Sequence, residues 1–82
     1  MKLPRNINGE ELAKRLSRKG YTPVHQTGSH VKLKAIIDGK THTITIPLHK
    51  PLRVGTFHQI LKDVAEHLHL ALDQLVRELF DN

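Results

Sequence analysis

The dipeptide Asp38-Gly39 separates two runs of the sequence in which apolar and polar residues alternate. An Asp-Gly pair between two such runs is a strong signal for a two-residue turn, and it predicts an antiparallel hairpin over residues 29–46. With Asp38 and Gly39 as the loop, Ile37 pairs with Lys40, and this pair fixes every other pair along the hairpin. Because a slip of one residue turns all side chains to the opposite face, the turn also decides which residues are buried.

The predicted register gives the sheet one apolar face and one polar face. The apolar face consists of three opposed pairs, which are Val31 and Ile46, Leu33 and Ile44, and Ala35 and His42. On the polar face His30, Lys32 and Lys34 alternate along one strand, because successive side chains of a strand point to opposite sides. A histidine is therefore expected at the end of a strand, on the same face as two lysines.

The rest of the sequence predicts three helices and one further strand. The expected elements are a helix over residues 8–19 that is capped by Asn8 and ended by Gly20, a strand over 21–27, a helix from near Thr56, and a helix over 71–80. The strand over 21–27 is expected at a sheet edge, because Pro23 cannot donate a hydrogen bond to a neighbouring strand. The order predicts one α+β domain, 1–82, in which helices cover one face of a three-stranded antiparallel sheet, as in the double-stranded-RNA-binding fold with an extra C-terminal helix.

The net charge of +5 is unevenly distributed along the chain. Residues 1–60 carry a balance of +8, whereas residues 61–82 carry a balance of −3. A basic body with an acidic last helix suits a polyanionic partner such as RNA. The chain has only Tyr21, Phe57 and Phe80 as aromatic residues, which argues against binding by base stacking. Contact with RNA is therefore expected to rest on charge and shape.

The sequence contains no cysteine, which excludes the class of small secreted proteins that are cross-linked by disulfides. No apolar run approaches the roughly 18 residues of a membrane span, and the first residues lack the apolar stretch of a signal peptide. We therefore expect an intracellular protein that has no membrane partner.

Seven histidines make a metal site the first alternative to consider. His67 and His69 are two residues apart, which on a helix turns them to different faces, and His42 and His49 have no evident partners. The sequence also lacks a His-Glu-x-x-His motif and any cysteine that could complete a ligand set. We therefore expect no metal and no cofactor. His42 is interpreted as a residue at the border of the apolar sheet face, and His58, His67 and His69 as helix-surface or turn residues.

His30 differs from the other histidines in its neighbours. Gly28 and Ser29 are small residues that let a phosphate approach the backbone closely, and Lys32 and Lys34 project from the same strand face. Histidine exchanges protons near neutral pH, and RNA supplies its own nucleophile in the 2′-hydroxyl group. One histidine and two lysines therefore meet much of the need for RNA cleavage without metal. On spacing alone, the simpler interpretation of His30 is an ordinary surface histidine.

Four segments of the sequence resemble the HicA toxins of bacterial HicAB toxin–antitoxin systems. These segments are Leu16-x-x-Lys19-Gly20-Tyr21, Gln26-x-Gly28-Ser29-His30, Ile46-Pro47-x-His49 and Gly55-Thr56-x-x-x-Ile60-Leu61. They follow the family's order and spacing from about residue 8 to residue 65. The Gly-Ser-His triplet is a weak signal by itself, but together with the other three segments it is quite specific.

The resemblance implies a double-stranded-RNA-binding-like fold, cleavage of mRNA independent of translation, and neutralisation by a HicB-type antitoxin in the cytoplasm of a bacterium or archaeon. It also implies that the family's catalytic histidine falls on His30, with Gly28 and Ser29 completing that motif. The second group needed for proton transfer stays open between His25 and His49.

The chain departs from the family in three places. The stretch Val31–Lys34 lacks the aromatic residue that the family often has, Phe57 and His58 replace a more usual leucine and basic residue, and an acidic third helix is added. The added helix could serve self-association or antitoxin docking. Two other functions remain open, a non-catalytic RNA-binding module on the same basic face and a protein that acts through a protein partner. An inactive copy of a toxin is a further alternative.

Overall fold

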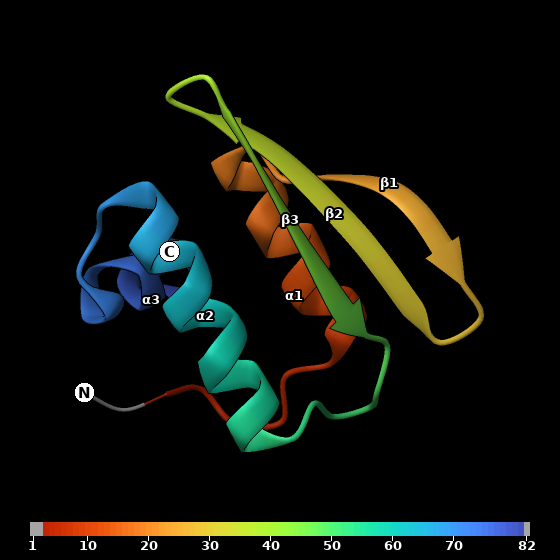
Figure 1. The fold of residues 1–82 in the computed structure, drawn as a ribbon. Helices are drawn as coiled ribbons and strands as arrows, with labels where there is room; N and C mark the ends of the chain where they lie inside the picture. The colour runs from red at the N-terminus through yellow and green to blue at the C-terminus, as the bar shows by residue number, and fades with distance from the viewer. Residues whose placement is uncertain (1–2, 82) are drawn as a thin grey trace.

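A three-stranded antiparallel sheet and three α-helices form the fold of residues 3–81, the part of the chain that the computed structural model describes (Figure 1). The strands are β1 (Thr22–Thr27), β2 (His30–Ile37) and β3 (Lys40–Pro47), in the sheet order β1-β2-β3. The helices are α1 (Gly9–Leu16), α2 (Val54–Leu68) and α3 (Leu72–Phe80), and a 3-10 turn, η1 (Ser17–Lys19), continues α1. The α+β class and the double-stranded-RNA-binding-like order predicted from the sequence are confirmed.

The β2–β3 hairpin has the register that its turn residues predict. Ile37 pairs with Lys40, Leu33 pairs with Ile44, and the remaining pairs continue to His30 opposite Pro47. Asp38 and Gly39 both have positive φ, as a two-residue hairpin turn of this kind requires. Burial alternates strictly along β2, so that one face of the hairpin is buried and the other is exposed.

The first helix and the first strand differ from the sequence prediction in detail. Asn8 takes the N-cap position of α1 with an extended backbone, but its side chain makes no capping hydrogen bond, so that part of the prediction is wrong. Gly20 ends η1 in the left-handed conformation with φ 89°, as expected. The strand β1 lies at a sheet edge, as Pro23 predicts, and its pairing with β2 is interrupted between Pro23 and His25.

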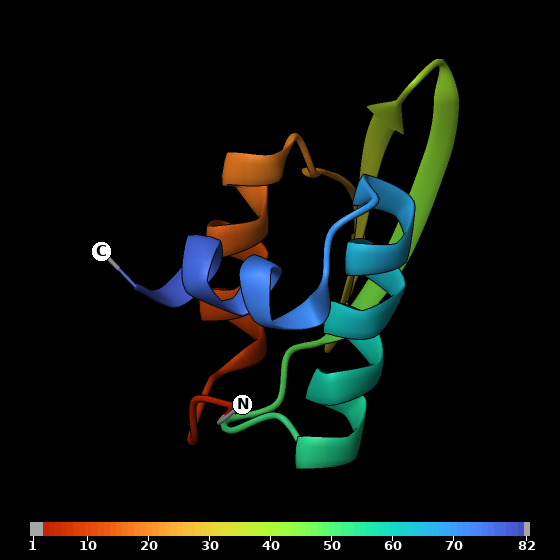
Figure 2. The ribbon, with the colours of Figure 1, turned by 90° about the vertical axis from the view of Figure 1, so that its left-hand side faces the viewer.

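The helices bury the apolar face of the hairpin. Helix α1 packs behind the sheet and α2 runs alongside β3, while α3 contacts both α1 and α2 (Figures 1 and 2). The largest fully buried side chains come from every layer of the fold and are Tyr21, Leu12, Leu16, Leu33, Ile46, Leu61, Leu75, Leu79 and Val64. No helix within residues 3–81 combines the length and hydrophobicity that are needed to cross a bilayer.

Helix α3 completes the hydrophobic core. Its apolar residues Leu75, Val76 and Leu79 are buried against the rest of the domain. Arg15 of α1 donates a hydrogen bond of 2.7 Å to the backbone oxygen of Leu79, and its guanidinium lies 4.7 Å from the centre of the Phe80 ring. The apolar face of the added helix is therefore occupied inside the domain, and only its charged outer face is left for the docking or self-association considered from the sequence.

Candidate functional site

His30 lies at the start of β2, on the exposed face of the sheet. It is paired on both sides, with Thr27 of β1 and with Pro47 of β3. The backbone around it is held by the segment after β3, because Leu48 donates a backbone hydrogen bond of 2.7 Å to the oxygen of Ser29. The imidazole thus projects into solvent from a backbone that is fixed by both neighbouring strands.

The Gly28-Ser29 turn shapes the approach to His30. Gly28 has φ +36°, and a Cβ atom at this position would meet nothing within 4 Å, so the backbone is open to a ligand. The Ser29 hydroxyl lies 3.2 Å from Nδ1 of His30. Within residues 3–81 no protein group bonds the other ring nitrogen, Nε2, which is therefore available for proton transfer to or from a ligand.

A basic strip continues from His30 along the exposed face of β2. Lys32 and Lys34 lie opposite Thr45 and Thr43 of β3, and both lysines are exposed. The three strands contain no aspartate or glutamate. Among the described residues neither lysine takes part in an ion pair. The face therefore presents positive charge without a competing carboxylate, which suits a phosphate backbone.

The two candidates for the second proton-transfer group lie on different elements. His25 of β1 is directly opposite Lys32, which places it on the same face as His30 and diagonal to it across the strands. Directly opposed Cβ atoms in a sheet are about 4.5–5.5 Å apart, and diagonal neighbours are about 7–8 Å apart, with their Cβ atoms somewhat closer. His49 lies in the loop after β3, where its backbone oxygen accepts a hydrogen bond of 3.0 Å from the amide of Gly9. Of the two, the strand register brings His25 to the face of His30.

The family model described as "HicA toxin of bacterial toxin-antitoxin" matches residues 9–65, which is more than half of the chain. The chain belongs to the HicA toxin family. The resemblance stated from its four sequence segments is thereby confirmed, and membership implies an antitoxin partner. The family is generally one of ribonuclease toxins. No curated protein and no solved structure matches the chain.

This HicA-family chain also contains a polar cluster that sequence reasoning missed. His42 is only 7% exposed, and its Nδ1 lies 2.5 Å from the hydroxyl of Tyr21. Its Nε2 lies 3.3 Å from a carboxylate oxygen of Asp63, and its ring stacks on that of His67 at 3.5 Å between centres. His42 lies at the end of the apolar sheet face, paired with Ala35, as expected, but the expectation that it has no partners is wrong. The spacing of Asp63 and His67, one helical turn apart, was the one signal in the sequence.

The same cluster changes the acidity of Tyr21. Burial of the hydroxyl, with a smaller contribution from the Asp63 carboxylate, raises the pKa of Tyr21 from 10.0 to about 12. The hydroxyl therefore stays protonated at all physiological pH values and serves as a hydrogen-bonding group for His42. In this HicA-family fold, hydrogen bonds connect Tyr21, the residue before β1, to His42 on the buried face of β3, and His42 to Asp63 on helix α2.

Proposed function

We propose that this HicA-family chain is a metal-independent endoribonuclease that cleaves mRNA and thereby inhibits translation, with His30 as its catalytic histidine. The observation that carries the proposal is the exposed strip of β2, on which His30 is followed by Lys32 and Lys34 while the strands carry no carboxylate. Family membership supports the same activity, because the family consists of toxins of toxin–antitoxin systems.

The proposed reaction uses the 2′-hydroxyl of the RNA as nucleophile. A base removes the proton of this hydroxyl, the 2′-oxygen attacks the adjacent phosphorus, and the bond to the 5′-oxygen of the next nucleotide breaks. An acid donates a proton to that leaving oxygen, so the products are a 2′,3′-cyclic phosphate and a 5′-hydroxyl end. General acid–base catalysis of this kind contributes about 10²–10⁴-fold to a rate.

The basic strip would bind and stabilise the phosphate in this reaction. Lys32 and Lys34 neutralise the charge of the RNA backbone, and this charge increases at the transition state. The open backbone at Gly28 lets the phosphate come close, and the Ser29 hydroxyl, 3.2 Å from Nδ1 of His30, orients the imidazole. A proton then moves at Nε2 of His30, the ring nitrogen that has no hydrogen-bond partner within residues 3–81.

His25 is the second proton-transfer group in this proposal. It shares the exposed face with His30, and Lys32 lies directly opposite it. Diagonal neighbours in a sheet are about 7–8 Å apart, so two imidazoles in this arrangement can approach the two oxygens on either side of one phosphorus atom. His49 is the competing assignment, and a comparison of the cleavage rates of His25→Ala and His49→Ala decides between them.

The biological setting follows from the family. We propose that the whole chain, residues 1–82, acts as one toxin domain in the cytoplasm of a bacterium or archaeon. A HicB-type antitoxin would neutralise it by covering the basic strip that binds RNA. Such a partner must present acidic or wedge-shaped surface to Lys32 and Lys34.

A cleavage assay with a labelled mRNA tests the proposed activity. Purified protein is incubated with the RNA in the presence of a chelator, and a matched substrate carries a single 2′-deoxy substitution at a mapped cleavage site. We expect products that end in a 2′,3′-cyclic phosphate, no requirement for metal, and loss of cleavage at the substituted position. Salt-sensitive binding without any product would instead establish the alternative function, a non-catalytic RNA-binding module.

A further inference from the structure

A second group of chemistry-bearing side chains lies far from His30. His42, Asp63 and His67 each offer one potential ligand atom, and these atoms all lie within 4.8 Å of one another. The geometry points to a divalent-metal site here, of the zinc class, that fastens the end of α2 to β3. This site goes beyond the proposed ribonuclease activity and does not depend on it.

The ligand set matches what zinc uses in proteins. Zn²⁺ takes imidazole nitrogens and carboxylate oxygens at about 2.0–2.2 Å, and sites with three protein ligands leave a fourth position for water. Two of the ligands, Asp63 and His67, are four residues apart on one helix and therefore share a face, while His42 comes from the strand packed against it. Ligands from two separate elements make the site a link between them.

One pair of atoms already has the separation that a bound ion requires. Two ligands about 2.1 Å from a tetrahedral ion lie about 3.4 Å apart, and Nε2 of His42 lies 3.3 Å from an oxygen of Asp63. Nδ1 of His67 lies 3.7 Å from the other oxygen of the same carboxylate. The same Nδ1 lies 3.1 Å from the backbone oxygen of Asp63, so closing the site requires His67 to give up that contact and rotate its ring.

The buried ligand is oriented by a second residue. The Tyr21 hydroxyl engages Nδ1 of His42 at 2.5 Å, which leaves Nε2 as the nitrogen that faces Asp63. Metal-binding histidines almost always have their other nitrogen fixed in this way by a neighbouring oxygen. Tyr21 is fully buried, so this orientation is part of the folded core.

His67 is the ligand whose side chain must move when a metal binds. Its ring now stacks on that of His42 with an interplanar angle of 9°, and parallel rings cannot both aim their in-plane lone pairs at one ion. The side chain of His67 is 44% exposed, so it can turn out of the stack. Metal binding is therefore expected to break the ring stack and to keep His42 in place.

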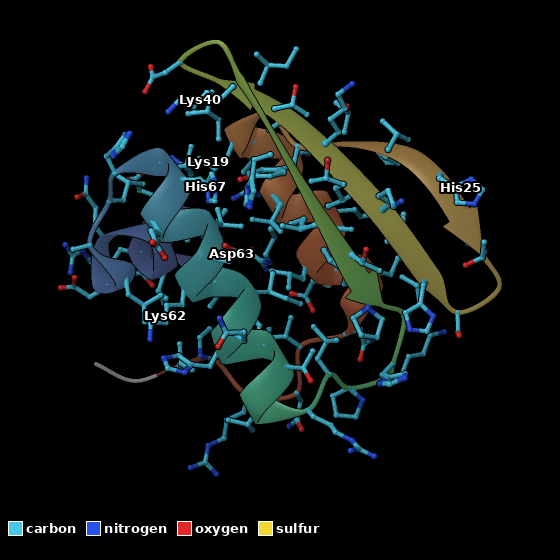
Figure 3. All side chains as sticks on the ribbon, viewed as in Figure 1. Lys19, His25, Lys40, Lys62, Asp63 and His67 are labelled. Carbon is cyan, nitrogen blue, oxygen red and sulfur yellow. The ribbon has the colours of Figure 1, made fainter. Side chains whose placement is uncertain are left out.

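An ion has an access route through a surface hollow next to His67. This hollow of about 440 Å³ is lined by Ile37, Asp38, Lys40, Glu66, His67 and His69. Figure 3 shows His67 and Asp63 on α2, at the opposite side of the molecule from His25 on β1. Along the hairpin His42 pairs with Ala35, five residues from His30, or about 17 Å at 3.3 Å per residue. The proposed metal site is thus separate from the proposed ribonuclease face.

Titration of the full chain with Zn²⁺, followed by calorimetry, tests the proposal. We expect one ion per chain, bound well below millimolar Zn²⁺. His67→Ala and Asp63→Asn should weaken binding by at least about 10-fold. The matched control is His58→Ala, which removes another exposed histidine of α2 that lies outside the cluster. Circular dichroism confirms that each variant is folded, and no variant of the buried His42 is needed.

Imidazole resonances locate the ion independently of affinity. In the wild-type chain Zn²⁺ should shift the ring signals of His42 and His67 and leave those of His25 and His58 unchanged. Three results overturn the proposal: no binding at millimolar Zn²⁺, equal affinities for His67→Ala and His58→Ala, or shifts confined to other histidines. If the wild-type chain does not cleave RNA, that result contradicts only the proposed function, because the metal titration uses no RNA.

Discussion

Substitution of Gly9 by alanine is expected to destabilise the protein, although helix propensity alone predicts the opposite sign. Glycine within a helix is about 1 kcal/mol less favourable than alanine. At Gly9, however, a Cβ atom would lie 2.0 Å from the backbone oxygen of Pro47 and 3.0 Å from Cα of Leu48. The obstacle is backbone, so no side-chain rotation can relieve it.

The structure sets the size of the effect. Cβ contacts under 3.0 Å are essentially never seen, so α1 and the segment after β3 must separate by about 1 Å. Overpacking of this kind costs about 1–3 kcal/mol, and the hydrogen bond from the Gly9 amide to His49 contributes about 1 kcal/mol more. The gain in helix propensity offsets about 1 kcal/mol of this cost, which leaves a net loss of about 1–3 kcal/mol. A loss of this size lowers the melting temperature of a domain of this size by about 4–24 °C.

Gly55→Ala is the matched control, and thermal unfolding followed by circular dichroism is the assay. Gly55 lies in the first turn of α2, and a Cβ atom there meets nothing within 4 Å. This variant should therefore gain about 0.5–1 kcal/mol and melt a few degrees higher than the wild type. A Gly9→Ala protein as stable as Gly55→Ala would refute the close packing of α1 against the Pro47 carbonyl.

Two further predictions concern the basic strip and the buried tyrosine. Lys32→Ala and Lys34→Ala should each weaken RNA binding and reduce the steepness of the plot of log affinity against log salt concentration by about 0.7. Fluorescence anisotropy at several salt concentrations measures this slope. An unchanged slope would contradict a contact between that lysine and a phosphate. The only tyrosine of the chain should ionise with a midpoint near pH 12 in the folded state, against 10.0 when unfolded, in a spectrophotometric titration. Because only the unfolded chain loses this proton between these values, the free energy of unfolding should fall as pH rises from 10.0 to about 12, and Tyr21→Phe should lack this decrease.

The hairpin and its two faces could be predicted from sequence because they depend on local chemistry. A two-residue turn at Asp38-Gly39 and strict alternation determine the register, and the structure has this register at every pair. The exposure of Lys32 and Lys34 follows from the same alternation. Recognition of the family came from four short segments, and the match of the family model to residues 9–65 confirms the membership.

The packing of the helices could not be predicted in the same way. His42 reaches Asp63, 21 residues away in sequence, only because α2 packs alongside the buried face of β3. No local pattern in the sequence carries that packing. The close approach of Gly9 to the end of β3 could not be predicted from the sequence either, because a glycine at the start of a helix has several ordinary explanations. Long-range contacts of this kind require the three-dimensional structure.

The role of His30 is tested most directly by the cleavage rate of His30→Ala on a labelled mRNA in the presence of chelator. The control is His58→Ala, an exposed histidine on α2 away from the basic strip. If His30 transfers a proton in the reaction, its removal should lower the rate by at least about 100-fold while His58→Ala cleaves like the wild type. Equal rates for His30→Ala and the wild type, both folded by circular dichroism, would contradict the assignment.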